Sequence, residues 1–316
     1  MGLSATGPVF GGDVWVACLW LLSAAVAAWD PRIVASMAGR TGGTAVVAGG
    51  QRPLVVAVGA SNLSRGLARL VAVVNQWAGG PVDLLVAAGH GRSFGANSRV
   101  WNRRLPSVLG CGLWRSLDRL LAEDTEASRF RVAVVTDLGN DLLYGFSVEQ
   151  LAGWVEETLV RLRQRGFRVA ITRLPLASIN RVGPVRYRLL KAILVPGCPL
   201  SLAEIKSSTR SLDEAVGGIA ASQSVALIDQ PGSWYGFDAI HPRRPRLDQL
   251  WQQAAASWSA DVVPRGQGFP PTAAASWSVW SRVGLAAAEV RSLSRVMRFT
   301  PQPVVQLPDG TRVFLY

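Results

Sequence analysis

Four short motifs occur in a fixed order along this 316-residue chain, and each of the first three directly follows an apolar run. The runs cover residues 54–59, 82–88 and 132–138, and short apolar runs of this kind are typical of buried parallel strands. The carboxyl ends of parallel strands meet at one edge of a sheet, so the motifs are expected to lie close together. The four motifs are Gly59-Ala60-Ser61-Asn62, Gly89-His90-Gly91-Arg92-Ser93, Gly139-Asn140-Asp141 and, in a late loop, Asp238-Ala239-Ile240-His241.

Strand and helix patterns alternate through most of the chain, which predicts a mainly parallel sheet in an α/β fold. Apolar residues recur at helical spacing after Ser61, and a capping box of Ser147 and Gln150 starts a further helix. Two further strands bring the expected sheet to five. These other elements are helices ending near Gly79 and Gly166, strands over 167–174 and 225–228, and a last helix with apolar residues from Leu247 to Trp258.

The residue types in the motifs match the needs of nucleophilic catalysis. A serine hydroxyl must pass its proton to a base within hydrogen-bond reach. Asp238 stands three residues before His241, so its carboxylate can accept from one imidazole nitrogen while the other faces Ser61. The backbone N–H groups of Ser61 and Gly91 and the side-chain amide of Asn140 can stabilise a developing oxyanion. His90, the other histidine, is expected in loop packing or substrate contact.

These residues resemble the four sequence blocks of the SGNH/GDSL hydrolase superfamily over roughly residues 54–260. The resemblance implies a three-layer α/β/α sandwich of flavodoxin-like type. It also implies ester or acyl hydrolysis without a cofactor or metal, and the roles given above to Ser61, Gly91, Asn140, Asp238 and His241. Two positions depart from the pattern. Ala60 replaces the usual acidic residue, and Gly139 directly precedes Asn140 where the family has one residue between them.

Each motif alone has a plainer interpretation. Residues 59–62 and 139–141 are typical of helix N-caps after a strand, an Asp-x-x-His sequence is common in surface loops, and residues 89–91 fit a phosphate-binding turn. The correct order at the correct strand ends favours the joint interpretation, a serine esterase or deacylase. Two alternatives remain: an acyltransferase that uses the same residues, and a binding protein that keeps the fold without the chemistry.

Composition indicates one main globular unit, because 49% of the residues are hydrophobic and only 17% are charged. The formal charge of +12 attracts anionic partners, but no basic run interleaved with aromatic residues and no zinc-finger spacing indicates specific nucleic-acid binding. Cysteines at 18, 111 and 198 form no CxxC pair, so neither a disulfide framework nor a structural zinc site is expected.

Two segments are candidate covers of the site. Residues 92–113 show no evident regular structure and contain several arginines, which predicts a lid over an anionic or glycan-linked acyl substrate; a solvated loop is the favoured alternative. Arg92 and His90 are therefore candidate substrate contacts. Residues 178–202 would cover the site from the other side, with Arg181 and Tyr187 as candidate contacts.

Both ends lie outside the resemblance. Residues 1–50 are expected to be an N-terminal extension, and their apolar run at 14–29 is short for a membrane span of about 20 residues. No positive charge precedes that run, so a cytoplasmic location is favoured over export or membrane association. We expect the hydrolase domain at 51–263. A Pro/Gly-rich linker then leads into residues 264–316, with an amphipathic helix over 277–299 and a small hairpin around Pro308 to Gly310. The basic side of that helix suggests contact with a membrane surface, the chain's own domain or a second subunit.

Overall fold

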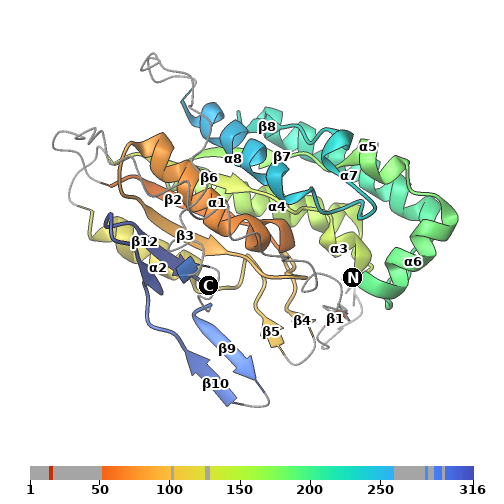
Figure 1. Cartoon of the computed structure of the whole chain (residues 1–316), viewed down its shortest axis with the longest axis horizontal. Helices are drawn as coiled ribbons and strands as arrows, with labels where there is room; N and C mark the ends of the chain where they lie inside the picture. The colour runs from red at the N-terminus through yellow and green to blue at the C-terminus, as the bar shows by residue number, and fades with distance from the viewer. Residues whose placement is uncertain are drawn as a thin grey trace, which may run out of the picture.

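A seven-stranded sheet forms the centre of the molecule, with the strand order β11-β12-β3-β2-β6-β7-β8 (Figure 1). The computed structural model describes residues 14–16, 52–100, 103–124, 129–259, 282–283, 288–293 and 296–316. All neighbouring strands in this sheet pair in parallel except β11 and β12. The strands are β2 (Leu54–Val58), β3 (Asp83–Ala87), β6 (Arg131–Val135), β7 (Arg168–Thr172), β8 (Ala226–Ile228), β11 (Val305–Gln306) and β12 (Arg312–Leu315).

Helices cover both faces of the sheet, so the predicted α/β/α sandwich is confirmed. In β2, Leu54, Val56 and Val58 pack against one layer of helices, and Val55 and Ala57 pack against the other. This alternation follows from the two-residue repeat of a strand. The first layer contains α2 (Leu113–Ala122), α4 (Val148–Gln164) and α7 (Leu202–Ser222), and the second contains α1 (Ser61–Ala78) and α8 (Arg244–Trp258).

Capping residues fix where the long helices begin. Ser147 and Gln150 form the predicted capping box at the start of α4. A second capping box, formed by Ser201 and Glu204, starts α7, a helix that was not predicted. The remaining helical elements are short or peripheral: α3 (Asn140–Leu143), α5 (Leu176–Asn180), α6 (Pro184–Leu194) and the 3₁₀ helix η3 (Gly232–Trp234).

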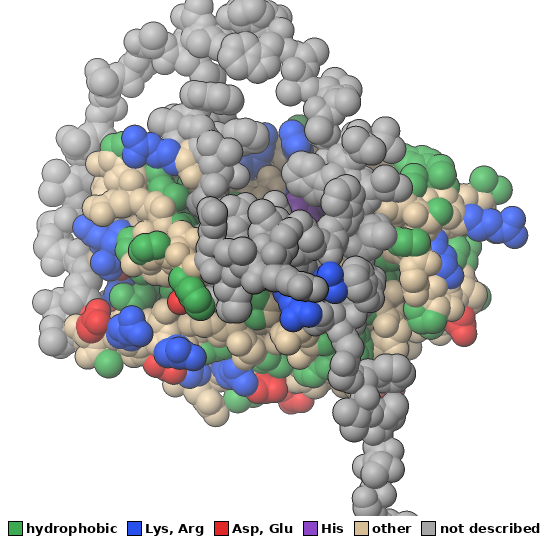
Figure 2. Space-filling view, turned by 90° about the horizontal axis from the view of Figure 1, so that it is seen from below, with side chains coloured by type: hydrophobic (Ala, Val, Ile, Leu, Met, Phe, Trp, Pro, Cys, Tyr) green, Lys and Arg blue, Asp and Glu red, His purple; other side chains and the backbone are tan. Residues whose placement is uncertain are grey.

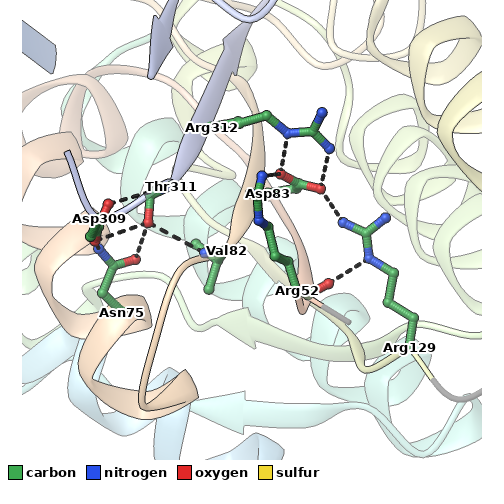
Figure 3. Close-up of polar contacts among 8 residues, drawn as sticks. All are labelled: Arg52, Asn75, Val82, Asp83, Arg129, Asp309, Thr311 and Arg312. Atoms are coloured by element: carbon green, nitrogen blue, oxygen red, sulfur yellow. Dashed lines mark hydrogen bonds and ion pairs between the residues drawn. The ribbon is translucent and has the colours of Figure 1, made fainter. Parts of the chain in front are cut away.

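The C-terminal hairpin belongs to the central sheet. The hairpin itself was predicted and is confirmed, but β12 pairs with β3 from Arg312 opposite Asp83 to Leu315 opposite Val86. Asp83 is buried, and the Arg312 guanidinium donates to both of its carboxylate oxygens at 2.6 Å (Figure 3). Arg129 donates to the same carboxylate. The sheet therefore has seven strands where five were expected, because the hairpin placed in the segment after residue 264 adds its two strands at this edge.

Contacts at the hairpin turn fasten it to α1 as well. The side-chain amide of Asn75 donates to Asp309 at 2.7 Å, and the Thr311 hydroxyl lies 3.1 Å from the Asn75 side-chain oxygen (Figure 3). Thr311 is fully buried. The hairpin is thus held both by the sheet and by the helix layer beside it.

The predicted helix over 277–299 is wrong over its second half. Residues 290–299 form an antiparallel pair, β9 (Val290–Leu293) and β10 (Val296–Phe299), joined by two residues. Residues 282 and 283 are helical, and most of the remaining predicted helix lies outside the described residues. Since residues 290–299 form strands, the predicted contact of an amphipathic helix with a membrane or a second subunit has no support in this segment.

Short strands also replace the expected loop over 92–113. β4 (Ser98–Val100) pairs antiparallel with β5 (Arg103–Leu105) and parallel with β1 (Val14–Val16), so the expectation of no regular structure there is wrong. The other residues of the expected extension at 1–50 lie outside the described part of the chain.

On the part of the face in Figure 2 that grey residues do not cover, basic side chains lie at several separate places, some beside acidic and some beside hydrophobic side chains. Within the residues that the structure describes, no helix combines the length and apolar character of a membrane span. Cys111 and Cys198 are buried free thiols, and Cys18 lies outside these residues.

Candidate functional site

The three strand-end motifs lie at neighbouring positions of the sheet, because β2 is flanked by β3 on one side and β6 on the other. The chain leaves β2 toward β3 and leaves β6 in the opposite direction toward β7. A crevice opens at the carboxyl ends of two strands whose connections diverge in this way. Ser61 follows β2 and Asn140 follows β6, so both residues line this crevice.

Ser61, His241 and Asp238 form a continuous hydrogen-bonded chain. The His241 Nε2 atom lies 2.7 Å from the Ser61 Oγ atom, and His241 Nδ1 lies 2.5 Å from Asp238 Oδ2. The other Asp238 oxygen accepts from the backbone N–H groups of Ile240 and His241, at 3.1 and 3.2 Å. These bonds fix the carboxylate, which in turn orients the imidazole toward the serine.

The charge of Asp238 is maintained by its neighbours. Burial by itself would raise the pKa of this carboxyl, but the hydrogen bond from His241, the backbone N–H of Ile240 and the positive charge of Arg65 together lower the pKa. A carboxylate that stays ionised keeps the imidazole N–H directed at it. Arg65 lies in α1, one turn after Ser61, and was not identified from the sequence.

Asp137, which was not predicted as a site residue, binds the backbone at the start of α1. Its Oδ2 atom accepts from the backbone N–H groups of Ala60, Asn62 and Leu63 at 2.8, 3.0 and 3.2 Å. A carboxylate at a helix N-terminus satisfies free N–H groups and stabilises the helix dipole. Asp137 has φ +62°, a left-handed conformation that Asp tolerates better than most residues. The available signal was an acidic residue two positions after the end of a buried strand.

Asn62 extends this connection to the histidine loop. Its side-chain amide donates to Asp137 Oδ1 at 2.7 Å and to the carbonyl oxygen of Ile240 at 3.1 Å. Ile240 directly precedes His241. Asp137 and Asn62 therefore connect the serine, the end of β6 and the histidine loop.

Replacing Asp137 by glycine is expected to lower kcat by at least about tenfold with a smaller change in KM, because the serine loses its connection to the histidine loop. Glycine permits the left-handed backbone, so the change removes the carboxylate without backbone strain. Asp137→Asn retains acceptor oxygen and should lie between Asp137→Gly and the wild type. Steady-state hydrolysis of a p-nitrophenyl ester, together with thermal melting, checks this. Equal kcat in all three proteins would contradict a positioning role.

The expected oxyanion donors lie in two loops that are joined to each other. Gly91 has φ +72°, and its carbonyl oxygen accepts from the Tyr144 hydroxyl at 2.8 Å. Tyr144 ends the short helix α3, which begins with Asn140. The Asp141 carboxylate also accepts from the backbone N–H of Phe94 at 3.0 Å, and burial raises the pKa of Asp141 to about 6. α3 therefore holds the loop after β3 through Asp141, which belongs to the third motif, and through Tyr144, which was not predicted.

Three other side chains, those of Arg92, His90 and Arg181, were predicted to contact substrate. Arg92 is 1% exposed, and its guanidinium donates to the carbonyl oxygens of Tyr316 and Ala88 at 2.5 and 3.1 Å. The expectation that Arg92 contacts substrate is therefore replaced by a structural role, which is to connect the loop after Gly91 to the C-terminal strand. His90 is half-buried in the same loop. Arg181 donates to the carbonyl oxygen of Gly232.

An apolar pocket extends from Ser61 toward α6. Residues 178–202 supply much of its wall, as predicted, and Tyr187 is among the lining residues. The wall elements are α3, the segment after β7, α5, α6 and the first half of α7. Among the described residues, no group of three or more His, Cys, Asp or Glu side chains is arranged to hold a metal ion.

No family model matches the chain, and no curated protein matches it. Similar solved structures include TesA, at 18% identity and a TM-score of 0.39, which covers 66% of this chain and 98% of that one. A lipolytic protein of the G-D-S-L family from Veillonella parvula has 14% identity and a TM-score of 0.39, with 67% and 98% covered. AlinE4, an SGNH-hydrolase family esterase, has 14% identity and a TM-score of 0.35, with 73% and 93% covered. Esterases of the SGNH/GDSL family, which the motifs resemble, are thus among these structures, at low identity and low TM-score.

Proposed function

We propose that the protein is a serine hydrolase that cleaves an ester or acyl group of a small-molecule or glycan-linked substrate. The observation that carries the proposal is the chain of hydrogen bonds from Ser61 Oγ through His241 to Asp238, at 2.7 and 2.5 Å. A carboxylate, an imidazole and a serine hydroxyl in this order are the parts of a general-base-activated nucleophile.

In the first half of the reaction, Ser61 Oγ attacks the carbonyl carbon of the substrate while His241 Nε2 accepts the hydroxyl proton. The negative charge that develops on the carbonyl oxygen is stabilised by the backbone N–H groups of Ser61 and Gly91 and by the amide of Asn140. The tetrahedral intermediate then collapses. The bond from carbon to the leaving oxygen breaks, and His241 gives its proton to that oxygen, which leaves an acyl group on Ser61.

In the second half, a water molecule takes the place of the leaving alcohol. His241 accepts a proton from the water as its oxygen bonds to the acyl carbon, and the proton passes to Ser61 Oγ when the acid leaves. An alcohol in the position of this water would make the same residues an acyltransferase. Aqueous hydrolysis without an added acceptor distinguishes the two reactions.

Labelling with a fluorophosphonate probe tests the proposal. The probe phosphorus reacts with an activated serine, so we expect stoichiometric labelling of the full-length protein and none of Ser61→Ala. Ser64, which lies in the same helix and donates its hydroxyl to the Ala60 carbonyl at 2.9 Å, provides a matched control in Ser64→Ala. Intact-protein mass spectrometry measures the added mass.

Labelling of Ser64→Ala to the same extent as the wild type would show that the reaction is specific to Ser61. A folded wild-type protein that the probe leaves unmodified would contradict the serine hydrolase and would favour a binding protein with this fold.

A further inference from the structure

The pocket beyond Ser61 has walls that are mainly apolar. Aliphatic side chains reach it from four separate elements: α3, α5, α6 and α7. Apolar pockets of this kind bind ligands mainly by removing apolar surface from water. The aliphatic lining side chains of these elements and of the loop after α5 include Leu143, Ile179, Val182, Leu190, Leu194 and Ile205.

Several polar side chains that line this pocket are paired with other protein groups. Arg173 donates to both oxygens of Asp213, at distances from 2.6 to 3.4 Å, and the Gln230 amide donates to the Arg173 carbonyl at 2.5 Å. The Tyr187 hydroxyl and the Lys191 ammonium group donate to one carbonyl oxygen, that of Leu200, at 2.5 and 3.3 Å. These side chains shape the wall, and their principal donors are occupied by protein acceptors.

Helix α6 forms one side of this pocket and is attached to the loop that carries the histidine. Arg186 donates to the carbonyl oxygens of Gly236 and Phe237 at 2.7 and 2.8 Å, directly before Asp238. The pocket wall and the hydrogen-bonded chain at Ser61 are therefore connected. The opposite side of α6 carries Val185 and Leu189, which are 80% and 48% exposed.

We propose that this pocket binds the acyl chain of the substrate, so that the enzyme prefers esters of unbranched acids of about eight or more carbons to acetyl esters. The inference rests on the proposed function, because it places the acyl carbon at Ser61 and the chain toward α6. Burial of each methylene group is worth about a fourfold gain in binding, so several buried methylenes give a large preference.

Two variants on α6 form the test. Leu190→Trp fills the pocket from its wall, and Leu189→Trp places the same side chain on the exposed side of the helix at the neighbouring residue. No side chain of α6 is fully buried, so both changes should leave the fold intact. Leu194→Phe is a second pocket variant in case Leu190→Trp lowers the thermal midpoint.

The measurements are kcat/KM for p-nitrophenyl acetate, butyrate, octanoate and decanoate, and calorimetric binding of decanoate to Ser61→Ala protein. We expect the wild type to prefer octanoate to acetate by at least about 100-fold. Leu190→Trp should lower kcat/KM for octanoate at least about tenfold more than kcat/KM for acetate. Leu189→Trp should match the wild type, and decanoate should bind to Ser61→Ala but not to Ser61→Ala with Leu190→Trp.

Labelling and chain-length preference together distinguish the acyl-chain pocket from the serine hydrolase activity. If the fluorophosphonate labels the protein but acetate is preferred to octanoate, the acyl-chain pocket is overturned and the serine hydrolase stays in place. The same holds if the protein is labelled and both tryptophan variants have equal effects. Decanoate binding that Leu190→Trp abolishes, in a protein that the fluorophosphonate does not label, would support the pocket and overturn the hydrolase. Absence of decanoate binding to Ser61→Ala would overturn the pocket irrespective of labelling.

Discussion

Deletion of residues 304–316 is expected to leave a chain that does not reach a stable fold. The deletion removes β12 from its place beside β3, and with it buried side chains at residues 313–316. Loss of one large buried side chain typically costs about 2–5 kcal/mol, and a domain is typically stable by about 5–15 kcal/mol. Loss of several together therefore consumes most of that stability. Soluble yield and thermal melting followed by circular dichroism measure the effect.

A pair of point variants in the same hairpin provides the control. Val313→Asp introduces an unpaired carboxylate at a fully buried position of β12, whereas Gln306→Asp changes an exposed residue of β11. The first should resemble the deletion, and the second should melt like the wild type. A soluble truncated protein with an unchanged melting temperature would show that the sheet is complete without β12.

The same strand influences the candidate site. The Tyr316 carbonyl oxygen accepts from the buried guanidinium of Arg92, which directly follows Gly91. Arg92 also donates to the Ala88 carbonyl at the start of that loop. A chain without β12 thus loses a partner of the loop that supplies one of the proposed oxyanion donors. Any folded fraction of the truncated protein should have a lower kcat for this reason.

The pairing of β12 with β3 could not be predicted from the sequence, for a physical reason. Arg312 and Asp83 are 229 residues apart, and each is a charged residue of the kind normally found at the surface. Local pattern indicates that residues 312–315 form a strand but says nothing about its partner. The buried ion pair becomes visible only when both strands are in place.

The incorrect helix at 277–299 shows a different limit. Val290, Leu293 and Val296 recur every three residues, which matches one face of a helix. The same three residues also fit a hairpin, in which Leu293 and Val296 are cross-strand partners beside a two-residue connection. Over so few residues the two periods are not distinguishable, and the structure adopts the strand alternative.

The candidate site was predictable where strand order and motif position coincide. Ser61, Gly91 and Asn140 follow neighbouring strands, so the apolar runs before them were enough to group them. Glycine is required at position 59 because β2 and β6 end close together there: a Cβ atom on residue 59 would lie 2.6 Å from the Thr136 side chain at the end of β6. Asp137 and Tyr144 were not predictable, because their roles depend on which loops the fold brings within hydrogen-bond distance.

His241→Ala is expected to lower kcat/KM by about 10⁴-fold or more, because Ser61 would lose the base that accepts its proton. The chain contains two histidines, so His90→Ala is the matched control, and its effect should be less than about tenfold. The measurements are hydrolysis of p-nitrophenyl octanoate and the rate of fluorophosphonate labelling.

The pH dependence of labelling separates a base from a residue that only supports the fold. In the wild type the rate should fall on acidification, because a protonated imidazole cannot accept from Ser61 Oγ. The pKa of Asp238 is lowered by its hydrogen bond with His241 despite burial, so this carboxylate stays charged as the imidazole gains its proton. The labelling rate of His90→Ala should show the same fall at acidic pH (the acid limb of the profile). The residual labelling rate of His241→Ala should lack this acid limb. Loss of activity in His90→Ala with an intact acid limb in His241→Ala would move the general base from the loop after β8 to the loop after β3, and with it the whole proton path proposed for Ser61.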